Sequence, residues 1–293
     1  MERLVEAVVV NYNAGEQLER AVKSLIDDGI ERVWIVDNAS EDGSTSFVDD
    51  AEKRVLVVKP GKNLGYGRAV NLGFGQTDSR YVVVCNPDIE VVHGALSSLV
   101  SELQADKDCA LVGPRIINFD GSTYPSVRHF PRLTDAAGHA VLGQLFPGNP
   151  FTRRYRMLGV DHRGSFSADW VSGAFFLVRS DVFKKVGGFD ERFFMYLEDV
   201  FLCRTIREHG YSVRFCGNAV VRHDQGLTTA SRPVRMILAH HRSLWTYARL
   251  TKKGWRRLEL LPIGVGIAVR MSISLSIVIL GRRAKKPELD RTK

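Results

Sequence analysis

Short apolar runs alternate with amphipathic segments along the first 112 residues. Two segments, 16–26 and 94–103, place apolar residues at the spacing of one helix face. Strands buried on both faces read as continuous β-branched runs, and such runs separated by helices predict an α/β fold with a mostly parallel sheet and helices on both faces. The runs expected to form the strands are residues 7–10, 33–36, 55–58, 81–85 and 110–112.

The second half of the chain departs from this alternation and then returns to it. Residues 114–168 are rich in Gly, Pro, Arg and aromatic side chains, and long irregular segments of this kind tend to be functional or mobile. The pattern resumes with a strand at 175–178, a helix from Asp181, a helix at 199–209, and strands at 211–215 and 220–221. From Pro233 the chain is expected to be helical to its end. We therefore predict one α/β domain over residues 1–230 and a helical extension over residues 231–293.

The two parts also differ in net charge. Residues 233–293 hold 14 of the 41 Lys and Arg but only 3 of the 33 Asp and Glu, a net charge of +11 that leaves −3 for the residues before them. A basic extension of this kind indicates an anionic partner surface, either a membrane or a nucleic acid. The four cysteines lack metal-ligand spacing, and the first residues lack the pattern of a signal peptide, so we expect reduced thiols in a cytosolic protein.

The most informative candidate is a carboxylate that directly follows the apolar run 81–85. Asn86, Pro87 and Asp88 form a turn at the carboxyl end of that predicted strand, the edge at which open α/β sheets bind ligands. A carboxylate there is suited to holding a divalent cation against a diphosphate. His223 follows another apolar run and is a candidate second ligand, although a lone histidine near a strand end is more often structural.

Two earlier strands also end in polar residues. The first ends at Asn11 and the second at Asp37. A carboxylate at that edge could accept hydrogen bonds from a nucleoside. The alternative is that Asp37 only caps a helix that follows it, together with Ser40 or Asp42.

A glycine-rich segment follows the third strand, at residues 63–71. Its Gly65 and Gly67 form half of a dinucleotide fingerprint, but the third glycine is replaced by Val70, which disfavours NAD binding. The glycines would let the backbone approach a ligand closely, with Arg68 donating to a phosphate. The alternative is an ordinary helix start with a solvated arginine.

Glu198 and Asp199 are adjacent carboxylates among aromatic and apolar residues. Their desolvation favours a raised pKa, which is what a general base near neutrality needs. Taken alone, the more ordinary interpretation is a helix N-terminus whose acids offset the helix dipole.

Taken together, these motifs resemble those of family 2 inverting glycosyltransferases of the GT-A (Rossmann-like) fold, over about residues 5–230. Within that family they look most like bacterial rhamnosyltransferases that act on a polyprenyl-diphosphate-linked sugar in cell-wall or polysaccharide assembly. Galactofuranosyl-, mannosyl- and N-acetylglucosaminyltransferases share the same motifs. The segments that carry the resemblance are residues 11–13, 37–44, 63–67, 86–88, 187–191 and 198–199.

The resemblance implies a donor half over about residues 1–113 and an acceptor half over about 114–230. It implies that Asp88 is the last acid of an Asp-x-Asp metal motif whose first position is Asn86 here, and that His223 is a late metal ligand. The implied cofactor is Mn2+ or Mg2+, and the implied donor is a dTDP- or UDP-sugar. The donor-binding residues implied by the resemblance are Asn11, Asp37, Asn63, Gly65, Arg68, Asn86 and Asp88.

The resemblance also implies that Asp199 is the catalytic base, with Glu198 its neighbour and substitute. Trp170, Ser172 and Gly173 correspond to positions that shape the sugar and acceptor pocket. The expected acceptor is a polyprenyl-diphosphate-linked saccharide, which would place the enzyme on the cytoplasmic face of the cell membrane, as a peripheral or monotopic protein and a possible homo-oligomer.

The basic extension contains a mostly apolar stretch at residues 260–280, interrupted by Pro262 and Arg270 and flanked on both sides by basic residues. An arginine in mid-span is costly, and basic residues on both sides give no orientation bias. We therefore favour a helix lying in the plane of an anionic membrane surface. The alternatives are a true membrane span and a helix packed on the domain.

Three other classes of protein fit less well. Nucleic-acid binding would rest on the basic extension alone, without an aromatic platform or a known reading motif, so no nucleic-acid partner is expected. A nucleotidyltransferase should have a Gly-rich basic loop after the first strand, where this chain has Asn11, Tyr12 and Asn13. A non-catalytic nucleotide-sugar-binding protein would not need the acids at positions 88 and 199.

Overall fold

The computed structural model describes residues 3–49, 53–130, 162–223 and 233–289. The chain divides into two compact units. The first comprises residues 1–194 and 198–225, and the second comprises residues 195–197 and 226–293. The boundary predicted at residue 230, and much of the irregular segment 114–168, lie outside the described residues.

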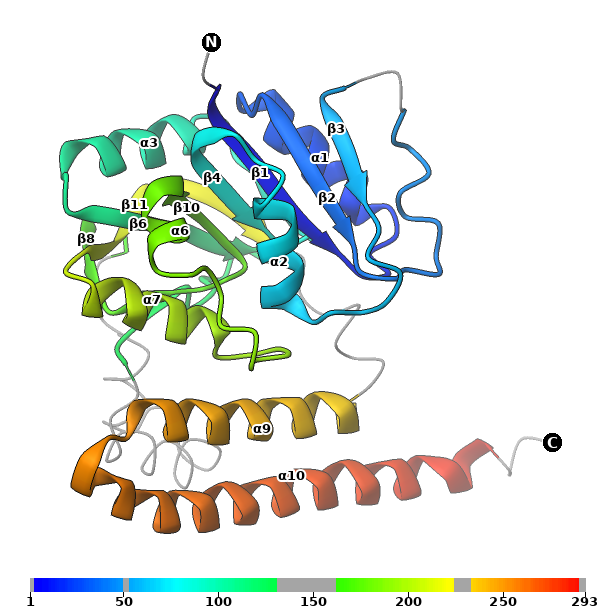
Figure 1. The fold of residues 1–293 in the computed structure, drawn as a ribbon. Coiled ribbons are helices and arrows are strands. Elements are labelled where there is room, and N and C mark those ends of the chain that lie inside the picture. The colour runs from blue at the N-terminus through cyan, green and yellow to red at the C-terminus, as the bar shows by residue number, and fades with distance from the viewer. Residues whose placement is uncertain (1–2, 50–52, 131–161, 224–232, 290–293) are drawn as a thin grey trace. The chain divides into compact units, whose positions relative to one another are not determined.

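A mixed nine-stranded sheet forms the centre of the first unit (Figure 1). Its strand order is β3-β2-β1-β4-β10-β6-β11-β5, with β8 paired to β11. β3, β2, β1, β4, β6 and β11 run in one direction, and β10, β5 and β8 run against them. The strands are β1 (Arg3–Asn11), β2 (Arg32–Asp37), β3 (Val55–Val58), β4 (Ser79–Cys85), β5 (Ile89–Val91), β6 (Cys109–Asn118), β8 (Ser165–Ala168), β10 (Phe175–Arg179) and β11 (Ser212–His223).

Helices cover both faces of this sheet, as predicted. α1 and α3 bury Leu18, Leu25 and Leu99 in the same apolar cluster as alternate residues of β1 and β2. On the other face, Gly73 of α2 lies so close to Val8 and Val36 that a Cβ would meet their methyl groups at 2.6 and 2.7 Å. The helices of the unit are α1 (Gln17–Asp27), α2 (Tyr66–Phe74), α3 (Ala95–Ala105), α6 (Ser180–Lys185) and α7 (Glu198–Glu208), and β7 (Val127–Arg128) pairs with β9 (Trp170–Val171) in a separate ladder.

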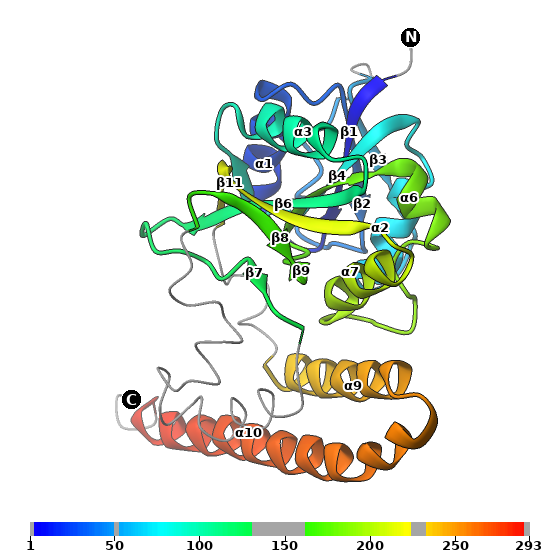
Figure 2. The ribbon, with the colours of Figure 1, turned by 90° about the vertical axis from the view of Figure 1, so that its left-hand side faces the viewer.

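The predicted α/β class and the mostly parallel sheet are confirmed, with one correction in the second half. The two strands expected at 211–215 and 220–221 are a single strand, β11, whose pairing with β6 shifts register between Cys216 and Val220. The register shift is a bulge within one strand, so the chain does not turn there. Figure 2 shows β11 running alongside β6.

The second unit is helical, as expected for the C-terminal extension. α9 (Pro233–Thr251), the short 3₁₀ helix η1 (Gly254–Glu259) and α10 (Leu260–Leu289) form a helical hairpin in which α9 and α10 lie side by side (Figures 1 and 2). The stretch Gly254–Leu280 is long and apolar enough to cross a membrane, with a mean hydropathy of 2.2 in its most apolar window, none of which is buried. Trp255 and Leu258 in η1 are 78% and 80% exposed.

Candidate active site

Two polar residues meet at the carboxyl ends of β1 and β2. Asn11 and Asp37 are paired in register, and both side chains are buried. The Asn11 amide nitrogen lies 3.3 Å from Asp37 Oδ1, 3.0 Å from Ser40 Oγ and 2.8 Å from Ser44 Oγ. Asp37 also accepts a hydrogen bond from the Ser40 backbone N–H at 3.2 Å. This network holds the Asp37 carboxylate in place at the sheet edge.

A tight turn before α2 lies next to this network. Asn38 accepts a hydrogen bond from the Leu64 N–H at 2.7 Å and donates to Asn63 Oδ1 at 3.1 Å. Gly65 adopts φ +83°, and a Cβ there would lie 2.3 Å from the backbone oxygen of Phe194. Only glycine satisfies both the left-handed conformation and this close approach. The glycine of the sequence motif therefore serves chain packing at this turn.

Asp88 and His223 come together from distant parts of the chain. Asp88 follows β4 and His223 ends β11, and His223 Nε2 lies 3.2 Å from Asp88 Oδ1. Both side chains are largely buried. Apart from this contact, Asp88 Oδ1 makes no hydrogen bond to the described residues, and His223 Nδ1 has no hydrogen-bond partner among them. The Tyr124 ring stands edge-on to the imidazole, with ring centroids 5.2 Å apart.

This pair fits a divalent cation whose coordination shell is completed by the substrate. A carboxylate oxygen and an imidazole nitrogen are both suitable donors for Mn2+ or Mg2+. Within the described residues, no group of three or more His, Cys, Asp and Glu side chains gathers to hold a metal. The remaining ligands would have to be water and diphosphate oxygens, which is the usual arrangement for Mg2+ in phosphate chemistry.

Glu198 and Asp199 begin α7 in different surroundings. The Gly173 N–H donates to Asp199 Oδ2 and the Val200 N–H donates to Asp199 Oδ1, both at 2.8 Å. Glu198 is buried, and its Oε2 has no hydrogen-bond partner in the part of the chain that the structure describes. Burial, reinforced by the charge of Asp199, raises the pKa of Glu198 to about 8. Burial also raises the pKa of Asp199, opposed by its two backbone donors and the charge of Arg128.

Tyr66, at the start of α2, lies within the motif segment 63–67 but is not among the predicted site residues. Its hydroxyl donates to the Gly173 carbonyl at 2.5 Å. Burial raises the pKa of Tyr66 well above its ordinary value, and the charges of Cys85, Glu198, Asp199 and Asp88 raise it further. The carboxylates of Asp88 and Asp199, 111 positions apart in the sequence, thus both act electrostatically on one phenol. The feature of the sequence that could have pointed to Tyr66 is an aromatic residue between two glycines at a helix start.

Gly173 connects Tyr66 and Asp199 through its backbone. Its carbonyl accepts from Tyr66 while its N–H donates to Asp199, and a Cβ at this position would lie 3.1 Å from the Asp199 Cβ. The neighbouring Ser172 is buried, and its N–H donates to the Ser126 carbonyl at 2.8 Å. Asn86 reaches the same segment, with its N–H donating to the Ala174 carbonyl at 2.8 Å. The predicted sugar-pocket segment thus contacts Asp199 directly and lies next to the backbone of Asn86.

Trp170 and Arg68 are held by contacts with other residues. The Trp170 indole is buried and donates to the His129 carbonyl at 3.0 Å, while the Arg128 guanidinium lies 5.3 Å from its ring centroid. Arg68 donates to the Glu191 backbone oxygen at 3.0 Å and pairs with the Glu191 carboxylate at 3.5 Å. Binding of a phosphate by Arg68 would therefore compete with this pairing.

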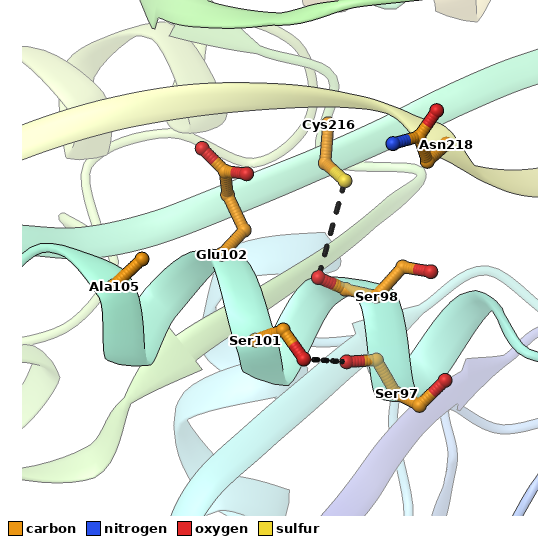
Figure 3. Close-up of a pocket in the computed structure, with 7 residues that line it drawn as sticks. All are labelled: Ser97, Ser98, Ser101, Glu102, Ala105, Cys216 and Asn218. Atoms are coloured by element: carbon orange, nitrogen blue, oxygen red, sulfur yellow. Dashed lines mark hydrogen bonds between the residues drawn. The ribbon is translucent and has the colours of Figure 1, made fainter.

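A separate pocket of about 400 Å³ lies between α3 and β11 (Figure 3). Glu102 of this pocket pairs with Arg214 at 2.5 Å. None of the predicted site residues lines the pocket, so it forms no part of the candidate site. Its lining residues are Ser97, Ser98, Ser101, Glu102, Ala105, Cys216 and Asn218.

Solved structures share the fold of this chain. The mannosyltransferase PcManGT from Pyrobaculum calidifontis, in complex with GDP-Man and Mn2+, aligns with a TM-score of 0.59 and 16% identity over 100% of this chain and 82% of its own. GalNAc-T7 with UDP, GalNAc and Mn2+ aligns with a TM-score of 0.58 and 16% identity over 76% of this chain and 43% of its own, so this chain spans less than half of that protein. These likenesses confirm the GT-A fold.

Sequence comparison identifies the family. The family model described as Glycosyl transferase family 2 matches residues 6–187. The N-acetylglucosaminyl-diphospho-decaprenol L-rhamnosyltransferase of Mycobacterium tuberculosis is 34% identical over 273 residues, covering 89% of each chain. Because the family match spans more than half of the chain and this relative aligns along most of its length, the chain belongs to glycosyl transferase family 2 and is a glycosyltransferase.

Proposed function

We propose that this glycosyltransferase moves L-rhamnose from dTDP-rhamnose to a lipid-linked saccharide, with inversion at the anomeric carbon. Similarity to a rhamnosyltransferase named for an N-acetylglucosaminyl-diphospho-decaprenol substrate supports the sugar and the lipid-linked acceptor. The observation that carries the proposal is that Gly173 joins Tyr66 to Asp199 through hydrogen bonds of 2.5 and 2.8 Å, while the charges of Asp88, Glu198 and Asp199 all act on the Tyr66 phenol. A metal-binding carboxylate and a base on two sides of one site are what a single displacement requires.

The donor half, about residues 1–113, would hold the nucleotide. Asp37 would accept hydrogen bonds from the nucleoside, with Asn11 fixing its carboxylate through the 3.3 Å contact. The turn at Asn63 and Gly65 would lie beside the diphosphate, together with Asn86. Arg68 would exchange its pairing with Glu191 for a phosphate oxygen. Each role uses an oxygen or N–H group at the carboxyl edge of the sheet, where open α/β sheets bind ligands.

Asp88 and His223 would hold a divalent cation, Mn2+ or Mg2+. When bound, the cation would neutralise negative charge that builds on the departing diphosphate. The 3.2 Å approach of His223 Nε2 to Asp88 Oδ1, in largely buried surroundings, supports this role. The Mn2+ present in the two structural neighbours is consistent with it.

Asp199 would act as the general base. It would take the proton of an acceptor hydroxyl, whose oxygen forms a bond to the anomeric carbon as the bond from that carbon to the diphosphate breaks. The nucleoside diphosphate leaves with the bonding electrons. Gly173 and Val200 orient the carboxylate by donating to its two oxygens, while Glu198 would remain protonated near neutrality because its pKa is about 8.

The acceptor half, about residues 114–230, would place the lipid-linked sugar against Asp199. Trp170, Ser172 and Gly173 would shape that pocket. A lipid-linked acceptor would require access to a membrane, and the exposed apolar face of α10 together with the basic residues around η1 supports attachment to an anionic bilayer at its cytoplasmic side. We propose in-plane attachment of this unit.

A donor panel tests the proposed reaction. Purified enzyme with Mn2+ or Mg2+ and a polyprenyl-diphosphate-linked N-acetylglucosamine acceptor is given dTDP-rhamnose, UDP-galactofuranose, UDP-N-acetylglucosamine or GDP-mannose. The proposal predicts transfer from dTDP-rhamnose, loss of transfer with EDTA, and an inverted product linkage. Transfer from another donor alone would reject the rhamnosyl assignment, and a retained configuration would reject the single displacement.

A further inference from the structure

The three residues before Glu198 include two in a strained backbone conformation. Tyr196 has φ +71° and Leu197 has φ +62°. Neither is a glycine, and consecutive non-glycine residues in the left-handed region are rare because each costs energy. Such a conformation persists only where surrounding contacts impose it, and it concentrates at functional sites. The segment Met195–Leu197 therefore needs a restraint.

Helix α9 supplies that restraint. Met195–Leu197 forms one compact unit with residues 226–293. Ser243 of α9 is 3% exposed, and its hydroxyl donates to the Met195 carbonyl at 2.8 Å. The Tyr196 ring meets the His240 ring edge-on, with centroids 5.4 Å apart. Both α9 residues, one turn apart on the helix, thus contact two successive residues of the strained segment.

The chain on either side of the segment is fixed by other contacts. The Phe194 carbonyl accepts from the Tyr66 N–H at 2.9 Å. Asp199 is fixed by the N–H groups of Gly173 and Val200. Only three residues join these two points, so the backbone path of Met195–Leu197 sets the direction in which α7 begins and in which Asp199 presents its carboxylate.

We propose that Ser243 and His240 are positioning residues for the base Asp199, acting through the backbone of Met195–Leu197. This inference rests on the proposed function, because it takes Asp199 to be the base. It assigns α9 a part in the rate of the chemical step in addition to any part in membrane attachment. A displacement of about 1 Å at a reacting group costs up to about 100-fold in rate, so loosening this segment should lower kcat strongly.

The test compares three variants of the full-length protein. Ser243→Ala removes the bond to Met195, Ser243→Thr keeps a hydroxyl, and Thr251→Ala removes a hydroxyl of the same helix that bonds the Tyr247 carbonyl at 2.8 Å. We expect Ser243→Ala to lower kcat about 10- to 100-fold with donor Kd changed less than about twofold. Ser243→Thr should restore most of the rate, and Thr251→Ala should keep it.

Amide hydrogen exchange provides a second readout that needs no turnover. Exchange over residues 195–200 should be faster in Ser243→Ala than in wild type and unchanged in Thr251→Ala. Unchanged kcat and exchange in Ser243→Ala would overturn the inference, as would a loss of kcat accompanied by an equal loss of donor affinity. If the wild-type protein transfers sugar from no donor, the proposed function fails, and the exchange comparison alone decides whether α9 restrains the segment.

Discussion

Glu198 and Asp199 are adjacent in sequence, but their environments differ. Asp199 accepts two backbone hydrogen bonds, which favour its ionised form and oppose the rise of its pKa by burial. Glu198 is buried, its Oε2 has no hydrogen-bond partner among the described residues, and its pKa is raised to about 8. The resemblance implied that Asp199 is the base, but the residues alone could not separate the two acids, because the separation depends on Gly173, which is 26 positions from Asp199.

Glu198 should make the stability of the protein fall with increasing pH. Below pH 4.5 both folded and unfolded chains hold its proton, but between about pH 4.5 and 8 the unfolded chain loses it while the folded chain keeps it. The free energy of unfolding therefore decreases across that interval. Glu198→Gln removes this titration, so the Tm of the variant relative to wild type should rise from pH 5 to pH 8.

The control for this measurement is Glu41→Gln, which changes an exposed carboxylate. Its Tm difference from wild type should stay nearly constant over the same range. A Glu198→Gln difference that is equally independent of pH would contradict the raised pKa.

Tyr66 should matter for rate through Gly173. Tyr66→Phe removes the donor to the Gly173 carbonyl, and the same glycine orients Asp199 through its N–H. We expect kcat to fall about tenfold, stability to fall by about 0.5–1.5 kcal/mol, and donor affinity to remain. Steady-state kinetics and thermal unfolding measure these effects.

Tyr211→Phe is the matched control. It also removes a phenol hydroxyl, one that accepts a hydrogen bond from Lys185 at 3.1 Å. Wild-type kcat in Tyr66→Phe would show that the phenol is only structural. Tyr66 escaped prediction because an aromatic residue at a helix start is common, and only the folded chain brings it beside residues more than 100 positions away.

At the scale of elements, the turn before α2 depends on Gly65 for two separate reasons. Its backbone, at φ +83° and ψ 172°, lies in a region that essentially only glycine adopts, and the contact of an added Cβ with the Phe194 oxygen at 2.3 Å would add to the cost of an alanine. Gly61→Ala is a matched control, since Gly61 has φ +77° and open space around it. Gly65→Ala should therefore lower Tm well below Gly61→Ala, as measured by thermal unfolding, and equal losses would contradict the steric argument.

The apolar runs predicted the strands of the sheet well, because strands buried on both faces leave a continuous signature. That signature carries no direction, so nothing in residues 175–178 indicated that β10 runs antiparallel to β4. The sequence predicts two strands where the structure has the single strand β11, because Gly217 and Asn218 interrupt the apolar pattern. Gly217 is instead a site of close backbone approach, where a Cβ would lie 2.4 Å from the His162 oxygen.

At the scale of the whole molecule, the helical unit provides a basic and apolar surface. Lys253 and Arg257 are exposed beside Trp255 and Leu258, a combination suited to the interface of an anionic bilayer. The full-length protein should float with vesicles containing anionic phospholipid, and each basic residue near the surface contributes about 1 kcal/mol. Lys253→Glu combined with Arg257→Glu should weaken binding more than 100-fold in a flotation assay.

Binding to vesicles of neutral lipid should be weaker, and added salt should reduce binding to the anionic ones. Equal binding to both kinds of vesicle, or indifference to the double substitution, would contradict electrostatic docking.

Asp199 acts as the base in the proposed reaction, while the donor is held by other residues of the site. Replacing it separates the two functions, so kcat and donor Kd should be measured for Asp199→Asn in the presence of Mn2+. We expect kcat to fall by about 10²- to 10⁴-fold and donor Kd to stay within about twofold of wild type. A wild-type kcat, or a donor affinity that falls in step with kcat, would show that Asp199 is not the base.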